Sequence, residues 1–386
     1  LNPETFASFA AERGLPRHLP GQVFRWVYER GIVDPEAMTD LSRDNRALLA
    51  RELDWLQATD VTPYRASDGT QKLLLAFPDR AADRSSASSD VAGAGDTIGV
   101  VSTDPSDASP VRLPIAGGEA DHARASMRLT ECVMIPTEKR RTACVSSQVG
   151  CPVGCAFCAS GIGGLEGNLT TGQIVEQVWR LGRLEEVGRI SHVVFMGMGE
   201  PLANYAAVTG AIRTLNAPWG LGISARRITV STVGLPAAIR RLVGFEIPVT
   251  LALSLHAPND ELRRRIIPWA EYATIAELLD ACQEWFRRTG REITLEYILL
   301  GGFNDRPEHA RELARVAKSI RANVNLIRYN EVRGMPFDRP ATADVLRFQE
   351  LLRDAGANTH IRASRGRDIA AACGQLRHEA KSAARS

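Results

Sequence analysis

The chain has 386 residues, of which 44% are hydrophobic and 24% are charged, as in an ordinary water-soluble globular protein. Forty-seven Lys and Arg against 45 Asp and Glu leave a net charge of +2, so any nucleic-acid binding has to come from local patches. No stretch approaches the roughly 18 consecutive apolar residues of a membrane span, and residues 1–13 lack the layout of a signal peptide. These features predict a cytoplasmic protein that does not enter a membrane.

The first part of the chain has a helical pattern. Phe6 and Phe9, and then Val23 and Phe24, recur at helical spacing, which predicts a small helical N-terminal domain over residues 1–60. We expect residues 61–130 to form a linker in which KLLLAF, residues 72–77, is a strand. Between residues 79 and 124 Ser, Asp, Ala and Gly dominate, and so weakly apolar a segment predicts a flexible insertion.

Strand-like and helical runs alternate from residue 142 onward. Strands are predicted at 143–147, 192–198, 227–231, 249–254, 292–299 and 325–329. Helices are predicted at 171–184, 205–215, 275–288, 308–320 and 343–355. Strands separated by helices form right-handed βαβ units and a parallel sheet. Six such units predict an α/β fold, with a partly closed barrel over residues 131–360 and a C-terminal tail over 361–386.

Four of the seven cysteines, Cys144, Cys151, Cys155 and Cys158, lie in one short segment. The last three form a CxxxCxxC string in a loop with glycines, directly after the first barrel strand. Three thiolates are one short of a closed structural zinc site, whereas a cubane of four irons held by three cysteines keeps one iron open. A zinc knuckle that borrows Cys144 or a histidine is the alternative.

In this position, the CxxxCxxC string resembles the signature of the radical S-adenosylmethionine (SAM) enzymes. The resemblance implies a partial (β/α)6 barrel, a [4Fe-4S] cluster held by Cys151, Cys155 and Cys158, and SAM bound at the open iron. It also implies reductive cleavage of SAM to a 5′-deoxyadenosyl radical, with an electron donor such as flavodoxin or ferredoxin.

Glycine and polar residues follow several predicted strands, on the face where barrels carry their active sites. The second strand runs into MGMGEP, and later strands end in serine, histidine or asparagine. Each residue alone is an ordinary turn glycine or a satisfied polar residue. Taken as a set, the resemblance implies that they bind SAM: Gly199, Glu200, Ser231, Ser254, Leu255, His256 and Asn330.

A narrower resemblance covers nearly the whole chain. The strings ECVMIP, CVSSQVGC, NLTTGQIVEQVW, MGMGEP, SLHAPND and AACGQL occur in this order, and they are similar to the radical SAM RNA adenine-C2 methyltransferases. That family implies methylation of an adenine of 23S rRNA and also of tRNA. After Cys158 the chain reads ASGIGGLEGNLT, which is closer to relatives that methylate C8, so C8 methylation is an alternative. A non-catalytic zinc-dependent RNA-binding protein is the alternative from another class.

The resemblance assigns roles to three further residues. Cys373 accepts a methyl group, Cys144 attacks Cys373 to leave a transient disulfide, and Glu131 accepts a proton. Alone, each would be read as a packing cysteine or a surface charge, and the joint occurrence with the three-cysteine string favours the catalytic roles. Cys282 lies on a helical apolar pattern and is predicted to be in the core, whereas Cys132 matches no role.

Basic residues gather in the C-terminal tail. Residues 361–386 contain Arg362, Arg365, Arg367, Arg377, Lys381 and Arg385 against Asp368 and Glu379. Such a patch favours phosphate binding that weakens with salt, although a solvated face would look the same. Because an enzyme acting on a base must take it out of its stack, we expect folded RNA with an accessible or flipped adenine as substrate. We also expect the enzyme to be a monomer.

Overall fold

The computed structural model describes residues 2–78, 97–100, 111–114 and 127–376. The predicted flexible insertion at 79–124 lies outside the described residues, except for β3 (Thr97–Val100) and β4 (Val111–Pro114). These two strands pair as an antiparallel hairpin where no strand was predicted. Among the described residues, no helix is both long and apolar enough to cross a bilayer.

A small helical domain begins the chain, as predicted. It contains α1 (Pro3–Glu12), α2 (Leu19–Phe24), a π-helical turn (Arg25–Arg30) and α3 (Arg43–Glu52). The side chains of Asn2 and Ser42 cap α1 and α3 by accepting backbone N–H groups. The domain has its own apolar core of Phe6, Leu19, Val23, Phe24, Trp26, Met38, Leu41 and Leu49.

The rest of the chain is built on one ten-stranded sheet. Its antiparallel part is β1 (Asp60–Arg65), β2 (Gln71–Phe77), β5 (Arg128–Pro136) and β6 (Arg141–Cys144). From β6 onward it is parallel, through β9 (His192–Phe195), β10 (Ile228–Thr232), β11 (Thr250–Ser254), β12 (Thr294–Leu299), β13 (Asn323–Arg328) and β14 (Thr359–Arg362). The predicted α/β fold is confirmed. The parallel part has one strand more than predicted, because β14 was not recognised, and neither β1 nor β5 was predicted.

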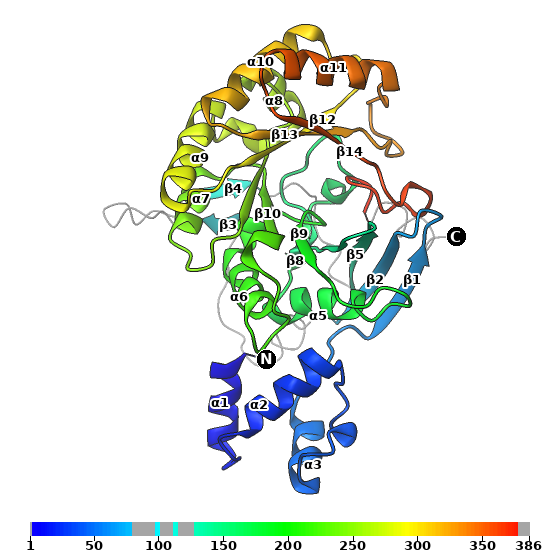
Figure 1. Ribbon diagram of the computed structural model, residues 1–386, viewed down its shortest axis with the longest axis vertical. Coiled ribbons are helices and arrows are strands. Elements are labelled where there is room, and N and C mark those ends of the chain that lie inside the picture. Colours follow the sequence, from blue (N-terminus) through cyan, green and yellow to red (C-terminus); the bar gives the residue numbers. More distant parts are fainter. Residues whose placement is uncertain (1, 79–96, 101–110, 115–126, 377–386) are drawn as a thin grey trace.

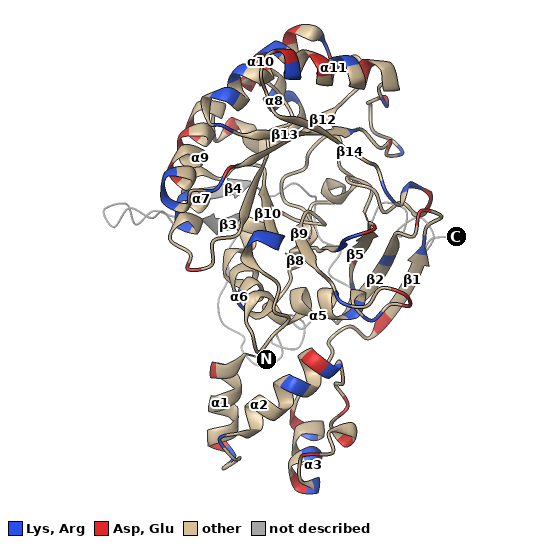
Figure 2. Ribbon diagram, viewed as in Figure 1, with Lys and Arg blue, Asp and Glu red and all other residues tan. Residues whose placement is uncertain are grey.

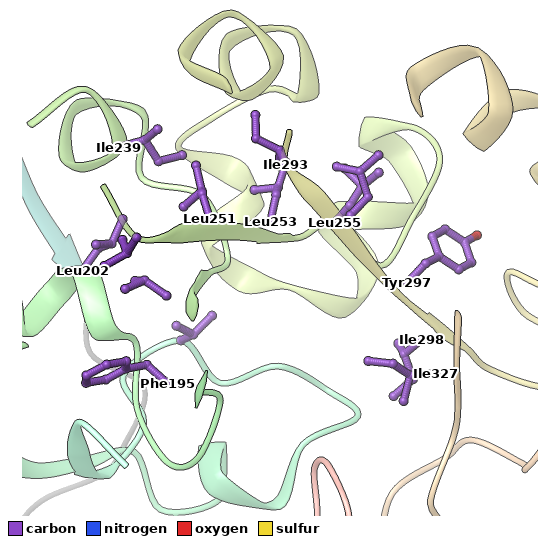
Figure 3. Close-up of a cluster of buried hydrophobic side chains, with 14 of the residues drawn as sticks. Phe195, Leu202, Ile239, Leu251, Leu253, Leu255, Ile293, Tyr297, Ile298 and Ile327 are labelled. Carbon is purple, nitrogen blue, oxygen red and sulfur yellow. The ribbon is translucent and has the colours of Figure 1, made fainter. Parts of the chain in front are cut away.

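Helices cover the outer side of the curved sheet, as Figure 1 shows. They are α5 (Thr171–Leu181), α6 (Tyr205–Asn216), α7 (Pro236–Val243), α8 (Asp260–Ile266), α9 (Ile275–Thr289), α10 (Pro307–Ser319) and α11 (Thr342–Asp354). Charged residues are frequent on several of these helices, whereas most of the strand length is neutral (Figure 2). Parallel strands buried on both faces read as continuous apolar runs. Figure 3 shows the result, with the fully buried Leu251 and Leu253 of β11 near Ile239 of α7.

The sheet does not close on itself, because β1 and β14 are its two ends. The tail that follows β14 is bonded to the turn between β1 and β2 instead. Gly366 donates its N–H to Asp68 Oδ2 at 3.0 Å, and Ser67 donates its N–H to Asp368 Oδ2 at 2.9 Å. Further along the tail, Cys373 and Gly374 line the cavity at the carboxyl ends of the strands.

Candidate active site

The three-cysteine loop lies between two short strands, β7 (Gln148–Gly150) and β8 (Leu165–Asn168), which pair antiparallel. Its shape depends on glycine at Gly161, where a Cβ atom would lie 2.9 Å from the Cα of Gly154. The loop is tied to the end of α8, because Ala156 donates its N–H to the carbonyl of Ile266 at 2.9 Å. The chain therefore holds this loop in a tight, fixed form.

The thiols of Cys151, Cys155 and Cys158 face one cavity and influence one another. Burial raises the pKa of Cys151 to about 12 and the nearby Cys158 adds to this; burial also raises the pKa of Cys155, with both other thiols contributing. Within the described part of the chain, no group of three His, Cys, Asp or Glu side chains meets the geometry of a metal-ion site. Three thiols that line one cavity and leave one position free have the ligand chemistry of an iron–sulfur cubane.

This first cavity, of about 140 Å³, is bounded by the thiols and by the carboxyl ends of the strands. It contains five of the seven residues predicted to bind SAM: Gly199, Glu200, Ser231, Ser254 and His256. A larger cavity of about 530 Å³ lies between the helical domain and α5, but no cysteine lines it. The chemistry-bearing residues therefore gather at the smaller one.

Glu200 is a buried carboxylate held by backbone groups. Its Oε1 accepts the N–H of Leu202 at 3.0 Å and its Oε2 accepts that of Val233 at 2.9 Å. Burial raises its pKa to about 7, although these hydrogen bonds act in the opposite direction. Gly199 before it has φ +101, and a Cβ there would meet the Cβ of Gln148 at 2.6 Å, so the turn requires glycine.

His256 is held as a neutral imidazole. Burial lowers its pKa to about 3, and Arg263 contributes to the shift. Its Nδ1 accepts the N–H of Ile298 at 3.1 Å, so in the neutral ring the proton sits on Nε2. Ser231 Oγ and Ser254 Oγ lie 3.1 Å apart across the neighbouring strands β10 and β11.

Two members of the predicted SAM set lie away from the first cavity. The side chain of Leu255 is fully buried in the apolar core, and its N–H is bonded to backbone carbonyls. Only its carbonyl, which already accepts Arg263 Nε at 3.2 Å, has a lone pair left for a ligand. Asn330 lines a second cavity, where its Nδ2 donates to the carbonyl of Cys373 at 3.3 Å. Arg339 donates to Asn330 Oδ1 at 2.9 Å, which fixes the orientation of the amide.

The second cavity, of about 260 Å³, contains both predicted reactive thiols, Cys144 and Cys373. Cys373 also borders the first cavity, so it lies in the wall between the two. The loop and the tail meet here, because Ala159 donates its N–H to the carbonyl of Gly374 at 2.7 Å. Burial raises the pKa of Cys144 to about 12, with the nearby Cys373 adding to the shift.

Glu131 lines neither cavity. It is buried on β5, and its Oε1 lies 2.8 Å from Lys72 Nζ of β2 in an ion pair with side-chain exposures of 2% and 7%. Lys72 Nζ also lies 3.5 Å from the carbonyl of Ala370 in the tail. The structure thus connects Glu131 to the tail through a lysine that the sequence analysis did not single out.

Two more charged residues were missed or misjudged. Arg362 was assigned to a basic tail that binds phosphates, but it lies on β14, lines both cavities and pairs with Glu296 at 3.2 Å. Glu296 was not singled out, although a carboxylate inside the apolar run TLEYIL of β12 was a signal. Arg365 and Arg367 of the basic patch are described, whereas the basic residues after 376 lie outside the described part.

The comparisons with known proteins agree with this geometry. Residues 145–317 match the Radical SAM superfamily, and residues 1–54 match the ribosomal RNA large subunit methyltransferase N-terminal domain. A protein of Rhodopirellula baltica named probable dual-specificity RNA methyltransferase RlmN is 41% identical over 367 residues, 95% of this chain and 86% of that protein. Its namesake in Gloeobacter violaceus is 40% identical over 381 residues, 98% and 94% of the two chains.

A solved structure extends the match to the whole fold. The crystal structure of a radical SAM methyltransferase from Sphaerobacter thermophilus superposes with a TM-score of 0.81 at 38% identity, and the match covers 98% of each chain. The open parallel barrel and the three-cysteine loop beside a cavity define a radical SAM enzyme. More narrowly, the chain belongs to the RlmN family of radical SAM RNA methyltransferases.

Membership settles the class of reaction and the cofactors. The chain is a SAM-dependent RNA methyltransferase that takes a [4Fe-4S] cluster and SAM. The alternative of a non-catalytic zinc-binding protein is therefore wrong.

Proposed function

We propose that this enzyme methylates C2 of an adenine in 23S rRNA, and an adenine of tRNA as well, with Cys373 as the carrier of the methyl group. The position of Cys373 between two cavities carries the proposal, because a carrier must reach both the donor and the acceptor. The names of the relatives, dual-specificity RNA methyltransferases, support the choice of substrates.

The first cavity is the proposed cofactor site. Cys151, Cys155 and Cys158 would hold the cluster, and the predicted polar set at the strand ends would hold SAM. When bound, the two supply a carbon-centred radical that abstracts hydrogen. The buried carboxylate of Glu200 suits an ammonium group, and the Nε2–H of His256 suits an acceptor oxygen or nitrogen. Leu255 would contribute through its backbone, and Asn330 would reach SAM from the side of the second cavity.

The second cavity is the proposed site of the target base. Ile135, Met196 and Ile327 give it apolar walls, and both reactive thiols open into it. A flat aromatic base taken out of its stack fits such surroundings, because apolar side chains replace the stacking it loses. The target carbon then lies against the sulfur that carries the new methyl group.

Release of the product is the proposed task of Cys144 and Glu131. The adduct links Cys373 Sγ through a methylene group to C2. Glu131 takes the proton from C2, and the unpaired electron left by radical addition would pass to the oxidised iron–sulfur cluster, so that the ring regains its aromatic electron count. The thiolate of Cys144 then attacks Cys373 Sγ. The S–S bond forms, the Sγ–CH2 bond breaks, and its electron pair stays on carbon, which takes up a proton to become the methyl group. The two sulfurs lose two electrons and the carbon gains them. Because Glu131 lines neither cavity, the tail near Ala370 has to shift for this step.

The decisive experiment follows methyl-labelled SAM into the anaerobically reconstituted full chain, by peptide mass spectrometry. We expect label on Cys373 in the wild type, none in Cys373→Ala, and a trapped protein–RNA adduct in Cys144→Ala. Cys282→Ala, in the buried core of α9, is the matched control and should behave as wild type. Label on another residue, or turnover by Cys373→Ala, would refute the proposal.

Regioselectivity needs its own measurement, because C2 and C8 methylation share the cysteine pair. Chromatography of nucleosides from digested 23S rRNA and tRNA separates the two methyladenosines, and we expect the C2 product in both RNAs. The C8 product in its place would transfer the chain to the alternative activity. We further propose that the enzyme acts as a cytoplasmic monomer and takes its electron from a flavodoxin or a ferredoxin.

A further inference from the structure

Four chemically active side chains meet where the two cavities adjoin. Arg362 of β14 lines both cavities, Cys373 lies beside it in both, Cys144 faces the second, and Glu296 faces the first. Arg362 Nη1 donates to Glu296 Oε2 at 3.2 Å and approaches Met196 Sδ at 3.3 Å. In the described part of the chain this guanidinium makes no other side-chain hydrogen bond, so its Nε and Nη2 donors stay available.

Glu296 fixes the position of that guanidinium. It is 3% exposed, and its second oxygen, Oε1, accepts Asn325 Nδ2 at 3.0 Å. Burial lowers the pKa of Arg362, but Cys373, Glu296 and Cys144 together outweigh burial and leave that pKa above its ordinary value. The cation is therefore stable in this interior position and is held from one side only.

Cys144 has little else to stabilise a negative charge. It packs among the apolar side chains of Val133, Met198 and Leu376. Cys373 from the tail disfavours its ionisation. Cys132 from β5 is a second nearby thiol, whose own pKa Cys144 helps to raise. Arg362 from β14 acts in the favourable direction, with a backbone N–H of Met196. Since a thiolate, and not a thiol, is the nucleophile, Cys144 needs such a counter-charge.

We propose that Arg362 is a positioning residue for product release, which stabilises the thiolate of Cys144 as it attacks Cys373, and that Glu296 holds the guanidinium in place. The inference rests on the release step of the proposed function. It also predicts a property of the resting enzyme, the reactivity of Cys144, which is measurable without RNA or SAM. The competing explanation is a purely structural Arg362–Glu296 ion pair.

The test measures the rate at which iodoacetamide, an uncharged reagent, alkylates Cys144 in the cluster-loaded full chain, resolved by peptide mass spectrometry between pH 7 and 9.5. Arg362→Gln should lower the rate at least tenfold at every pH, the equivalent of one unit in the pKa of Cys144. Arg362→Lys should restore most of the rate. Glu296→Gln should lower it less than Arg362→Gln does, because the guanidinium keeps its charge but loses the carboxylate that positions it.

Arg365→Gln is the matched control. It removes the same charge from the same segment and also lines the second cavity, but Arg365 lies 4.0 Å from Asp68 and does not influence Cys144. Its alkylation rate should equal that of the wild type. If Arg362→Gln folds poorly with Glu296 left unpaired, the double variant Arg362→Gln/Glu296→Gln removes both charges and should be as slow. A wild-type rate in either variant overturns the inference.

Turnover separates this inference from the proposed function. With RNA present, the Cys373 that becomes methylated in Arg362→Gln should accumulate as the protein–RNA adduct, whereas the wild type releases its product. Loss of Cys373 methylation in this variant would mean that Arg362 acts in the transfer of the methyl group from SAM to Cys373, and would overturn the step assigned to it. If the wild type itself forms neither methyl-Cys373 nor an adduct, the proposed function fails, while the alkylation rates still decide whether Arg362 governs Cys144.

Discussion

The buried ion pair of Lys72 and Glu131 allows a stability prediction for Lys72→Met. At 2.8 Å and an effective dielectric constant of about 20, the Coulomb attraction is about 6 kcal/mol, which the desolvation of the two ions largely offsets. Removal of one partner of a buried ion pair leaves the other charge less well compensated in the interior, which costs about 3–5 kcal/mol. We expect a loss of that size in the free energy of unfolding, because methionine replaces the volume of lysine but not its charge.

Urea denaturation followed by circular dichroism measures this loss. The matched control is Arg65→Met on the adjacent strand β1, whose partner is Glu186 and whose pair is 52% and 65% exposed. Its cost should be at most about 1 kcal/mol, as for surface ion pairs in general. The double variant Lys72→Met/Glu131→Gln should recover most of the stability. A cost for Lys72→Met no greater than that of Arg65→Met would refute the argument.

Three further predictions concern the cavities. Gly199→Ala should abolish SAM binding in equilibrium dialysis, because its Cβ would lie 2.6 Å from a neighbouring side chain; Gly290→Ala, with φ +67 but open space around it, should bind SAM normally. Burial raises the pKa of Glu200 to about 7, so the folded state binds this proton more tightly than the unfolded state does. As the pH rises from about 4.5 to 7, the free energy of unfolding of the SAM-free wild type should therefore fall by up to about 3 kcal/mol relative to that of Glu200→Gln. Urea midpoints that fall in parallel for both proteins would contradict this. Asn330→Ala loses its 3.3 Å bond to the carbonyl of Cys373 and should slow the labelling of Cys373 roughly tenfold at saturating SAM, which corresponds to about one hydrogen bond; an unchanged rate would show that the contact does not position the thiol.

Features written in local sequence were predicted well. The predicted helices, which are α5, α6, α9, α10 and α11, follow from the spacing of their apolar residues. The three-cysteine loop follows from one short string. β14 escaped because it has only four residues, THIR, two of them charged or titratable. Strand periodicity needs a longer run to emerge, so Arg362 was placed in the tail when it lies inside the barrel.

Contacts between residues far apart in the chain could not be predicted from the sequence. Lys72 and Glu131 meet because β2 and β5 are antiparallel neighbours, with Leu74 opposite Glu131. The stretch between these two strands carries no pattern that fixes this register. Likewise, the carbonyl of Cys373 bonds to Asn330 through the path of the tail, and no local rule gives that path. Pairings of this kind depend on topology, which single-sequence patterns do not encode.

The gap between β1 and β14 decides where the molecule is easiest to open. Two β-strands such as β12 and β13 share a six-residue parallel register, and prising them apart would break a whole ladder. At the gap, the tail is held by polar contacts such as those of Asp68 and Asp368, each worth about 1 kcal/mol, and by the burial of Ala371 and Leu376. We therefore expect RNA to enter by displacement of the tail, while the strands beside the cysteine loop keep their hydrogen bonds.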